Sequence, residues 1–210
     1  MATITVFGGT GYTGAAIVAE AAARGHDVVS VSRHQPRQPV DGVTYVHRSV
    51  TSGDPSSLVA SSDAVVGALA PRGDLAGKLG GVYQAVAETA EETGTRFVVI
   101  GGFTSLRRAP GGPRIALSEE LDPSYAAEAR EMATFAEWLT TTPAELDWLY
   151  LSPTAAYGSF NPQPARGTYR LGGDVVSADA GPHLAAADLA RAVLDLIEGN
   201  DHHREHLGVC

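Results

Sequence analysis

The sequence predicts an α/β protein, a single doubly wound domain that spans residues 1–210 around a parallel sheet. Short apolar runs alternate with helical patterns along the chain, which is typical of βαβ units. Most of these runs lack a strict alternation of polar and apolar residues, as expected for strands that helices cover on both faces. A glycine-rich segment at residues 8–14 directly follows the first run.

The expected elements follow one another in a regular order. Apolar runs predict strands at residues 3–7, 27–32, 44–48, 63–70, 96–101 and 147–151. Helices are expected at residues 11–24, for one or two turns at 55–60, and around the apolar spacings at 79–90, 132–139 and 189–197. Two longer irregular stretches, residues 104–124 and 152–180, follow the fifth and sixth strands. Ligands bind beyond the carboxyl ends of strands in such sheets, so we expect these stretches to form a small substrate-side cap.

Composition narrows the class of protein. The chain has 210 residues, of which 44% are hydrophobic and 19% charged, as in an ordinary globular domain. Its formal net charge of -9, with 15 Lys and Arg residues, argues against partners such as nucleic acid or anionic lipid. It shows neither an apolar run long enough to span a bilayer nor a basic signal-peptide region, and Cys210 is its one cysteine. We therefore expect a cytoplasmic protein without an intramolecular disulfide, and the sequence leaves monomer and dimer open.

The spacing of Gly8, Gly11 and Gly14 is the most informative motif of the chain. A strand precedes it, a helix follows it, and a second strand comes at the expected distance, which together indicate a dinucleotide-binding turn of the Rossmann type. We expect Gly8 to make the tight turn, Gly11 to let a pyrophosphate approach the backbone, and Gly14 to allow close packing of helix and sheet. The helix N-terminus would add N–H donors and a partial positive charge. The alternative is that the glycines serve only a tight turn.

The end of the second strand predicts which dinucleotide binds. An Asp or Glu there would bond the ribose 2′-OH of NAD, whereas an Arg suits the 2′-phosphate of NADP. This chain has no acidic residue at that point, and Arg33 follows the strand directly. We therefore expect NADP(H) to be preferred over NAD(H). The alternative is that Arg33 is a solvated loop residue and that Ser32 bonds a 2′-OH.

Several motifs together resemble a known family. In chain order they are Thr10-Gly11-Tyr12-Thr13-Gly14, Arg24-Gly25-His26, Ser32-Arg33, Ala68-Leu69-Ala70-Pro71, Gly101-Gly102-Phe103-Thr104-Ser105-Leu106 and Tyr169-Arg170-Leu171-Gly172-Gly173-Asp174. This order resembles the atypical short-chain dehydrogenase/reductase group of small NAD(P)H-binding proteins and NADH-flavin reductases, with NmrA-like regulators and biliverdin reductase B as more distant relatives. The resemblance covers nearly the whole chain.

The resemblance also implies a set of binding residues. The cofactor phosphates would be held by Gly8, Thr10, Gly11, Tyr12, Thr13 and Arg33. The adenosine and the nicotinamide ribose would lie against Ala68, Leu69, Ala70 and Pro71. The nicotinamide would be bordered by Gly101, Gly102 and Ser105, with Pro153 and Thr154 closing its far side.

The chemistry that the sequence permits depends on a missing residue pair. Most short-chain dehydrogenases protonate the reduced substrate with a Tyr that has a Lys four residues on, one helical turn away. Lys78 is the only lysine, and Ala129 stands four residues after Tyr125, which begins the corresponding helix. A flavin or quinone acceptor can take its proton from solvent, so we expect hydride transfer from NADPH to such an acceptor, with FMN or FAD as possible substrates. The alternatives are a non-catalytic NADP(H)-binding redox sensor of the NmrA type and a reductase or isomerase of a small carbonyl substrate.

Other polar residues remain candidates with two interpretations each. Ser105 and Tyr125 are the candidate catalytic residues: Ser105 would bond a substrate carbonyl or the nicotinamide carboxamide, and Tyr125 would donate a proton. Otherwise Ser105 is a turn residue and Tyr125 simply packs. A group of arginines, namely Arg107, Arg108 and Arg114, could grip an anionic acceptor, although a solvated loop is the expected role. The histidine-rich end, His202, His203 and His206, lacks a partner cluster elsewhere, and we expect no metal site.

Overall fold

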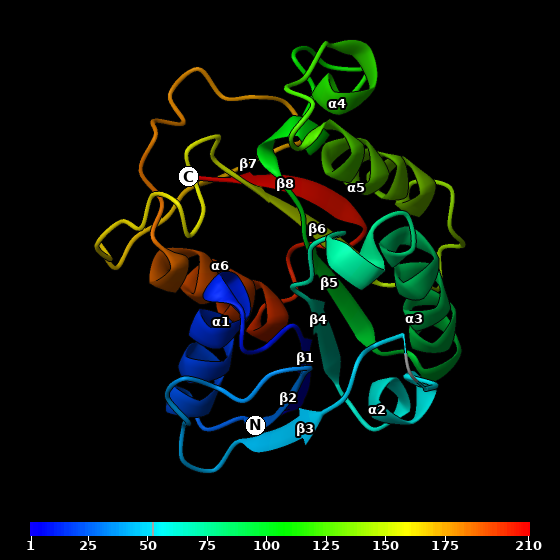
Figure 1. Cartoon of the computed structure of the whole chain (residues 1–210), viewed down its shortest axis with the longest axis vertical. Helices are drawn as coiled ribbons and strands as arrows, with labels where there is room; N and C mark the ends of the chain where they lie inside the picture. The colour runs from blue at the N-terminus through cyan, green and yellow to red at the C-terminus, as the bar shows by residue number, and fades with distance from the viewer. Residues whose placement is uncertain (52) are drawn as a thin grey trace.

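The computed structural model describes residues 1–51 and 53–210, and its strands form one eight-stranded sheet in the order β3-β2-β1-β4-β5-β6-β8-β7 (Figure 1). The strands are β1 Thr3–Phe7, β2 Asp27–Ser32, β3 Thr44–His47, β4 Ala64–Gly67, β5 Arg96–Ile100, β6 Trp148–Pro153, β7 Leu171–Gly172 and β8 Glu205–Val209. Neighbouring strands are parallel except β7, which runs antiparallel to β8 at the edge. The predicted doubly wound α/β fold with a mostly parallel sheet is confirmed.

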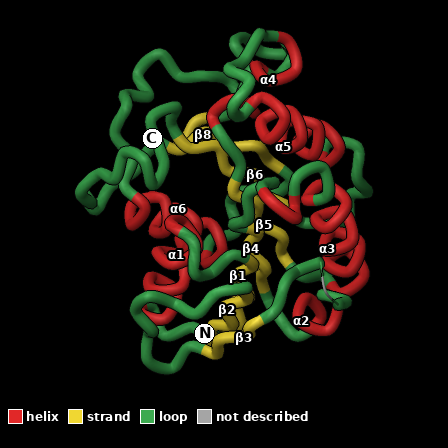
Figure 2. Tube along the Cα trace, in the orientation of Figure 1, coloured by secondary structure: helices red, strands yellow, loops and turns green. Residues whose placement is uncertain are grey.

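Helices cover both faces of the sheet (Figure 2). They are α1 Tyr12–Ala23, α2 Ser56–Ala60, α3 Leu79–Thr93, α4 Ile115–Ser118, α5 Ala126–Leu139 and α6 Ala186–Glu198, with short 3-10 turns at Gly73–Leu75 and Phe103–Ser105. Because successive side chains of a strand point to opposite faces, Ile4 and Val6 pack under α1 and α6 while Phe7 packs under α3. Two apolar cores result, one on each face, and burial of both faces explains the continuous apolar runs.

The C-terminal end of α3 follows from local sequence. Gly94 ends α3 in the left-handed conformation with φ 71°, which glycine adopts without a Cβ penalty. In α3 the apolar spacing buries Leu79, Tyr83, Val86 and Ala90. This is the face predicted for that helix, and it packs on the sheet.

The order of β1 and β4 determines where a ligand can enter. From β1 the chain moves outward to β2 and β3, and it then returns to place β4 on the other side of β1. The connections therefore diverge above the carboxyl ends of β1 and β4. In open α/β sheets, this switch point is where ligands bind.

The C-terminal part of the sheet contains two strands that the sequence did not predict. Glu205–Val209 forms β8 beside β6, and Leu171–Gly172 forms the antiparallel edge strand β7. The predicted strand at residues 63–70 was too long, since β4 ends at Gly67. The stretch at residues 104–124 contains the short helix α4. In the part of the chain that the structure describes, no helix has the length and apolarity that a membrane crossing requires.

Candidate functional site

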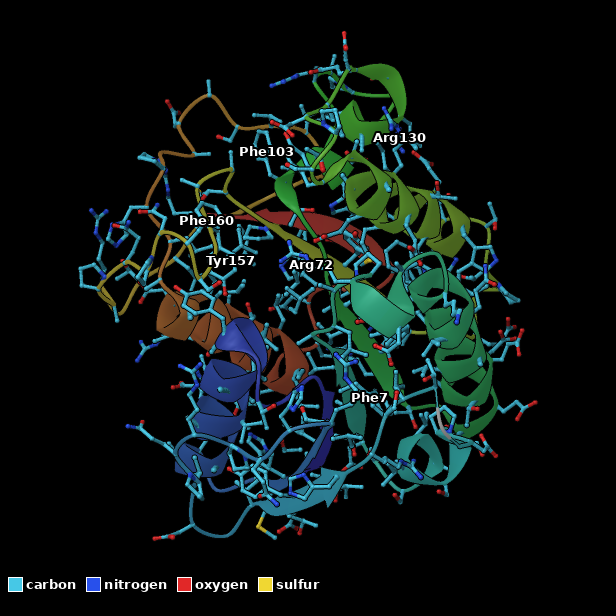
Figure 3. All side chains as sticks on the ribbon, viewed as in Figure 1. Phe7, Arg72, Phe103, Arg130, Tyr157 and Phe160 are labelled. Carbon is cyan, nitrogen blue, oxygen red and sulfur yellow. The ribbon has the colours of Figure 1, made fainter. Side chains whose placement is uncertain are left out.

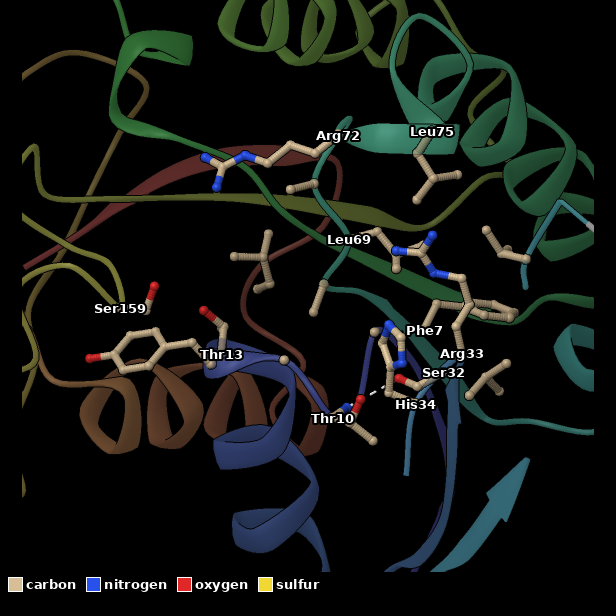
Figure 4. Close-up of a pocket in the computed structure, with 18 of the residues that line it drawn as sticks. Phe7, Thr10, Thr13, Ser32, Arg33, His34, Leu69, Arg72, Leu75 and Ser159 are labelled. Atoms are coloured by element: carbon tan, nitrogen blue, oxygen red, sulfur yellow. Dashed lines mark hydrogen bonds between the residues drawn. The ribbon is translucent and has the colours of Figure 1, made fainter. Parts of the chain in front are cut away.

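A cavity of about 530 Å³ opens at the switch point between β1 and β4 (Figure 4). Residues from the ends of β1, β2, β4 and β5 line it, together with the loop after β3 and the loop after β6. Its walls include Gly8, Thr10, Gly11, Tyr12, Thr13, Ser32, Arg33, His34, Arg48, Ser49, Ala68, Leu69, Ala70, Arg72, Gly101, Tyr157, Ser159 and Phe160. The cavity is large enough for an extended small molecule.

The glycine loop forms the floor of this cavity through close backbone packing. Gly8 has φ +87°, and a Cβ there would lie 2.4 Å from the carbonyl oxygen of Ala68. A Cβ on Gly14 would lie 2.2 Å from the carbonyl oxygen of Gly8, so α1 can approach the loop only with glycine at this position. Gly11 caps α1 without a side chain over the opening, and its N–H donates to the Gly8 carbonyl over 2.9 Å. The N-terminus of a twelve-residue helix therefore faces the cavity.

One end of the cavity carries arginine and histidine side chains. Arg33 and His34 follow β2, and Arg48 follows β3. The Arg33 guanidinium forms an ion pair with Asp74, and both side chains are roughly half exposed, at 48% and 42%. Arg33 is therefore paired at the surface, and its role toward a 2′-phosphate stays a prediction. Ser32 contributes a hydroxyl that accepts from the Thr10 N–H over 3.2 Å, which links β2 to the glycine loop (Figure 4).

The opposite end of the cavity is aromatic. Tyr157 lies against Tyr12, with ring centroids 5.6 Å apart, and its hydroxyl is 2.7 Å from the Thr13 hydroxyl. Burial raises the pKa of Tyr157 well above its usual range, so its hydroxyl stays protonated. Phe160 is 77% exposed and lies on the same side as Tyr157, whereas Arg72 lies toward α3 (Figure 3). Arg72 is held by Glu128 of α5 through two hydrogen bonds.

The middle of the cavity consists mostly of backbone. The segment after β4 is anchored by the buried Tyr83 of α3, whose hydroxyl accepts from the Leu69 N–H over 3.0 Å. Ala68 in turn donates its N–H to the Phe7 carbonyl over 2.8 Å. The side chains of Ala68 and Ala70 are small and project little into the cavity, so a ligand can lie along the strand ends.

The structure brings most of the sequence-predicted binding residues to this one cavity. Those that line it are Gly8, Thr10, Gly11, Tyr12, Thr13, Arg33, Ala68, Leu69, Ala70 and Gly101. Four others, Gly14, Pro71, Gly102 and Pro153, lie outside its lining, and Pro153 borders a second, smaller cavity instead. Their binding roles stay predictions.

The two candidate catalytic residues, Ser105 and Tyr125, do not line the cavity. Ser105 is buried, and its hydroxyl lies 2.9 Å from the hydroxyl of Tyr150, which in turn donates to the Met132 carbonyl. Tyr125 precedes α5 and is 42% exposed. Ser105 therefore lies in the interior and Tyr125 at the surface, and neither residue lines the cavity beside the glycine loop.

A buried ionic cluster replaces the solvated loop expected at residues 107–114. Arg114 is fully buried, donates to the Ser105 carbonyl over 2.7 Å, and has Glu137 at 2.9 Å. Arg107 lies 2.7 Å from both Glu137 and Asp174. The expectation was therefore wrong for these two arginines, because ion pairs with α5 and with the loop after β7 hold them. Arg108 remains at the surface, paired with Glu119.

The histidines near the C-terminus point to three different partners. His206 is buried in β8, where its Nε2 lies 2.8 Å from the Ser152 hydroxyl. Burial, together with the Arg114 charge, lowers the pKa of His206 well below its usual range, so the ring is neutral. His202 pairs with Glu205, and His203 pairs with Asp147. Over the described residues, no group of three or more His, Cys, Asp or Glu side chains has the arrangement of a metal site.

Arg48 lines the cavity but was not predicted as a binding residue, although the strand pattern could have indicated it. The register of β2 and β3 pairs Ser32 with His47, so the residues that follow, Arg33 and Arg48, leave the sheet side by side. Arg33 directly follows one predicted strand and Arg48 ends the next, and the carboxyl ends of parallel strands meet at one edge. Tyr157 and Phe160 had no such signal, because only the folding of a long loop brings them to Thr13.

Comparison with known proteins agrees with this geometry. A family model described as NAD(P)H-binding matches residues 8–200. The uncharacterized protein YwnB of Bacillus subtilis is 29% identical over 98% of this chain and 97% of its own length. A crystal structure from Bacteroides thetaiotaomicron, provisionally named an epimerase, is 28% identical with a TM-score of 0.82 over 99% of this chain and 95% of that one. A Streptococcus pneumoniae protein, provisionally named an NADH-flavin reductase, has the same fold at a TM-score of 0.82 and 22% identity, over 100% and 99% of the two chains.

Proposed function

Because this chain belongs to the NAD(P)H-binding family, we propose that it is an oxidoreductase that transfers hydride from NADPH to a flavin, a quinone or a similar flat acceptor. The observation that carries the proposal is the cavity itself, which joins a glycine loop at a helix N-terminus to a cationic end formed by Arg33 and Arg48. We also infer that the chain is an atypical member of the short-chain dehydrogenase/reductase group and acts in the cytoplasm on a small-molecule acceptor.

The residues of the glycine loop fit a dinucleotide. The open backbone at Gly11 and the N–H groups of the first turn of α1 would hold the phosphates, with no acidic side chain in that turn to repel them. Glycine at position 14 lets the N-terminus of α1 come close to the loop, since a Cβ there would clash with the loop backbone. When bound, the cofactor would supply a hydride from its nicotinamide ring.

The cationic end fits a 2′-phosphate. Arg33 and Arg48 leave adjacent strands and line the same part of the cavity, beside His34 and Ser49. A guanidinium pairs well with phosphate because its N–H donors match the phosphate oxygens. Asp74 neutralises part of this charge, so the net attraction for a phosphate depends on Arg48 as well as on Arg33.

The choice of acceptor rests on which proton donors reach the cavity. Reduction of a carbonyl leaves an alkoxide that must be protonated, whereas a reduced flavin or quinone can take its proton from water. The Ser105 hydroxyl is hydrogen-bonded to the Tyr150 hydroxyl, and Tyr125 does not line the cavity. Two tyrosines, Tyr12 and Tyr157, line it. Their rings pack against each other, and burial holds the Tyr157 proton tightly. These surroundings favour an acceptor that needs no protein acid.

The test is NADPH oxidation by the purified protein with FMN or a quinone, against NADH and a protein-free control. We expect saturable turnover that favours NADPH. In the Arg33→Glu variant, NADPH affinity should fall by about tenfold or more, because a charge-assisted contact is replaced by a repulsive one, while NADH affinity changes little. Equal losses for the two cofactors would contradict the assignment of the 2′-phosphate to Arg33.

The same assay separates the two alternatives. Binding of NADPH without oxidation of any acceptor would favour a redox sensor. Reduction of a small carbonyl substrate that disappears in Tyr125→Phe, with flavin reduction absent throughout, would favour a carbonyl reductase. If Tyr125→Phe leaves flavin or quinone reduction intact, the proposed function holds.

A further inference from the structure

A second cavity, of about 140 Å³, lies at the carboxyl ends of β6 and β8. Strand β7 and the loop after it border the cavity. Its walls are largely apolar and include Phe103, Leu106, Pro153, Val175, Val176 and Val209. Cofactor binding, as proposed above, uses only residues of the first cavity and leaves this second cavity without a ligand.

The second cavity begins one strand away from the cofactor cavity. The N–H of Gly101, which lines the cofactor cavity, donates to the carbonyl of Leu151 over 2.9 Å. The next residues of that strand, Ser152 and Pro153, line the second cavity. Adjacent strands lie about 5 Å apart, so the two cavities adjoin at the same edge of the sheet.

We propose that this second cavity binds the ring of the hydride acceptor and that the acceptor is a one-ring quinone. The inference rests on the proposed function and narrows its acceptor class. An apolar protein cavity of about 150 Å³ holds one benzene molecule. The volume here therefore matches one six-membered ring.

The polar groups of the cavity agree with a neutral quinone. The Ser152 hydroxyl is already engaged, 2.8 Å from both the Gly102 carbonyl and His206. The Thr154 hydroxyl has a carbonyl partner, that of Pro182, only at 3.5 Å, so it can turn to donate to a quinone oxygen. The lining also includes Arg170, Asp179 and the C-terminal Cys210. Most of the wall is nevertheless apolar, which favours an uncharged ring over an anionic one.

The reaction balances without a further reactant. The quinone gains a hydride, that is, one hydrogen with two electrons, from NADPH, and one proton from solvent. The products are a hydroquinone and NADP⁺. No protein side chain changes its oxidation state.

The first experiment compares acceptors of increasing ring number. NADPH oxidation is measured with dimethylbenzoquinone, with menadione and with FMN, and each rate is corrected for the protein-free reaction. We expect kcat/KM to be highest for the one-ring quinone. A higher kcat/KM for FMN than for dimethylbenzoquinone would overturn the proposal.

Two substitutions at one wall position change the cavity in opposite directions. Val176→Phe fills it and should lower kcat/KM for dimethylbenzoquinone by about tenfold while leaving the Kd for NADPH unchanged. Val176→Ala enlarges it and should raise the preference for menadione over dimethylbenzoquinone. The backbone N–H of Val176 is bonded to the Arg107 carbonyl over 2.9 Å, so the loop keeps its anchor in both variants. The control is Val40→Phe, at a half-buried valine outside the lining of both cavities.

A binding measurement keeps this proposal distinct from the proposed function. Dimethylhydroquinone is titrated by calorimetry into the protein saturated with NADP⁺, so that no turnover is needed. Binding that is lost in Val176→Phe and kept in Val40→Phe supports the ring site even if no acceptor is reduced. Absence of binding, or equal binding in both variants, overturns it.

Discussion

Two groups of arginines lie at opposite parts of the molecule and differ in how their charge is balanced. Arg33 and Arg48 stand at the rim of the cofactor cavity, where Asp74 pairs with Arg33 at the surface. Arg114 is fully buried and, like Arg107, lies beside Glu137. The first group remains open to a ligand because solvent and the cavity surround it. The second is largely enclosed, and its ion pairs link the loops after β5 and β7 to α5.

The difference shows that an arginine's role depends on its surroundings more than on its place in a loop. A surface pair contributes little to stability, since water competes for both partners. A buried pair contributes little in net terms as well, yet removing one partner leaves an uncompensated group in the interior. Stability measurements should therefore respond strongly at the buried group, and cofactor binding should respond at the exposed one.

The largest effect is expected from Arg114→Ala. This change removes the hydrogen bond to the Ser105 carbonyl and leaves a cavity beside His206, so the free energy of unfolding should fall by about 3 kcal/mol. Urea denaturation measures it. Arg108→Ala is the matched control, since Arg108 belongs to the same loop but is exposed, and its free energy of unfolding should stay within error of the wild type. A similar loss in both variants would remove the contrast between the buried and exposed groups.

A smaller effect is expected from pH at His206. The pKa of this histidine is lowered in the folded protein, so below about pH 6.5 the unfolded chain binds a proton that the folded chain does not. Its contribution to stability is therefore present above pH 6.5 and is lost as the pH falls. Between pH 7 and pH 5.5 the loss should be about 1 kcal/mol, and His206→Gln should lack this part of the pH dependence. Identical slopes for the two proteins would mean that His206 is not held neutral.

The smallest effect is expected from Asp74→Asn. Removing the surface partner of Arg33 frees its guanidinium for phosphate, so the Kd for NADPH should fall by about threefold, with a smaller change for NADH. Fluorescence titration with each cofactor measures the two constants. A weaker NADPH affinity in this variant would instead assign Asp74 the role of orienting Arg33. Added salt should reduce the difference between variant and wild type, because both side chains are roughly half exposed.

The N-terminal half of the fold could be predicted because its signals are local. The strand patterns at residues 3–7 and 27–32 match β1 and β2, and the glycine spacing between them matches a turn whose packing admits no Cβ at position 14. Strand β8 was missed because five residues rich in polar and small side chains, Glu205–Val209, carry little strand pattern. A rule of topology could have found it: helix α6 follows β6 on one face of the sheet and must return the chain toward a neighbouring strand.

The sequence by itself determined the order of the strands from β1 to β6, the glycine turn and the arginine that follows β2, because each depends on residues close together in the chain. Only the tertiary structure decided that Tyr157 faces Thr13, that Asp74 pairs with Arg33, and that Arg114 is buried against Glu137. These contacts join segments that are distant in sequence, and their energies depend on burial and on neighbouring charge. Neither quantity exists until the chain has folded.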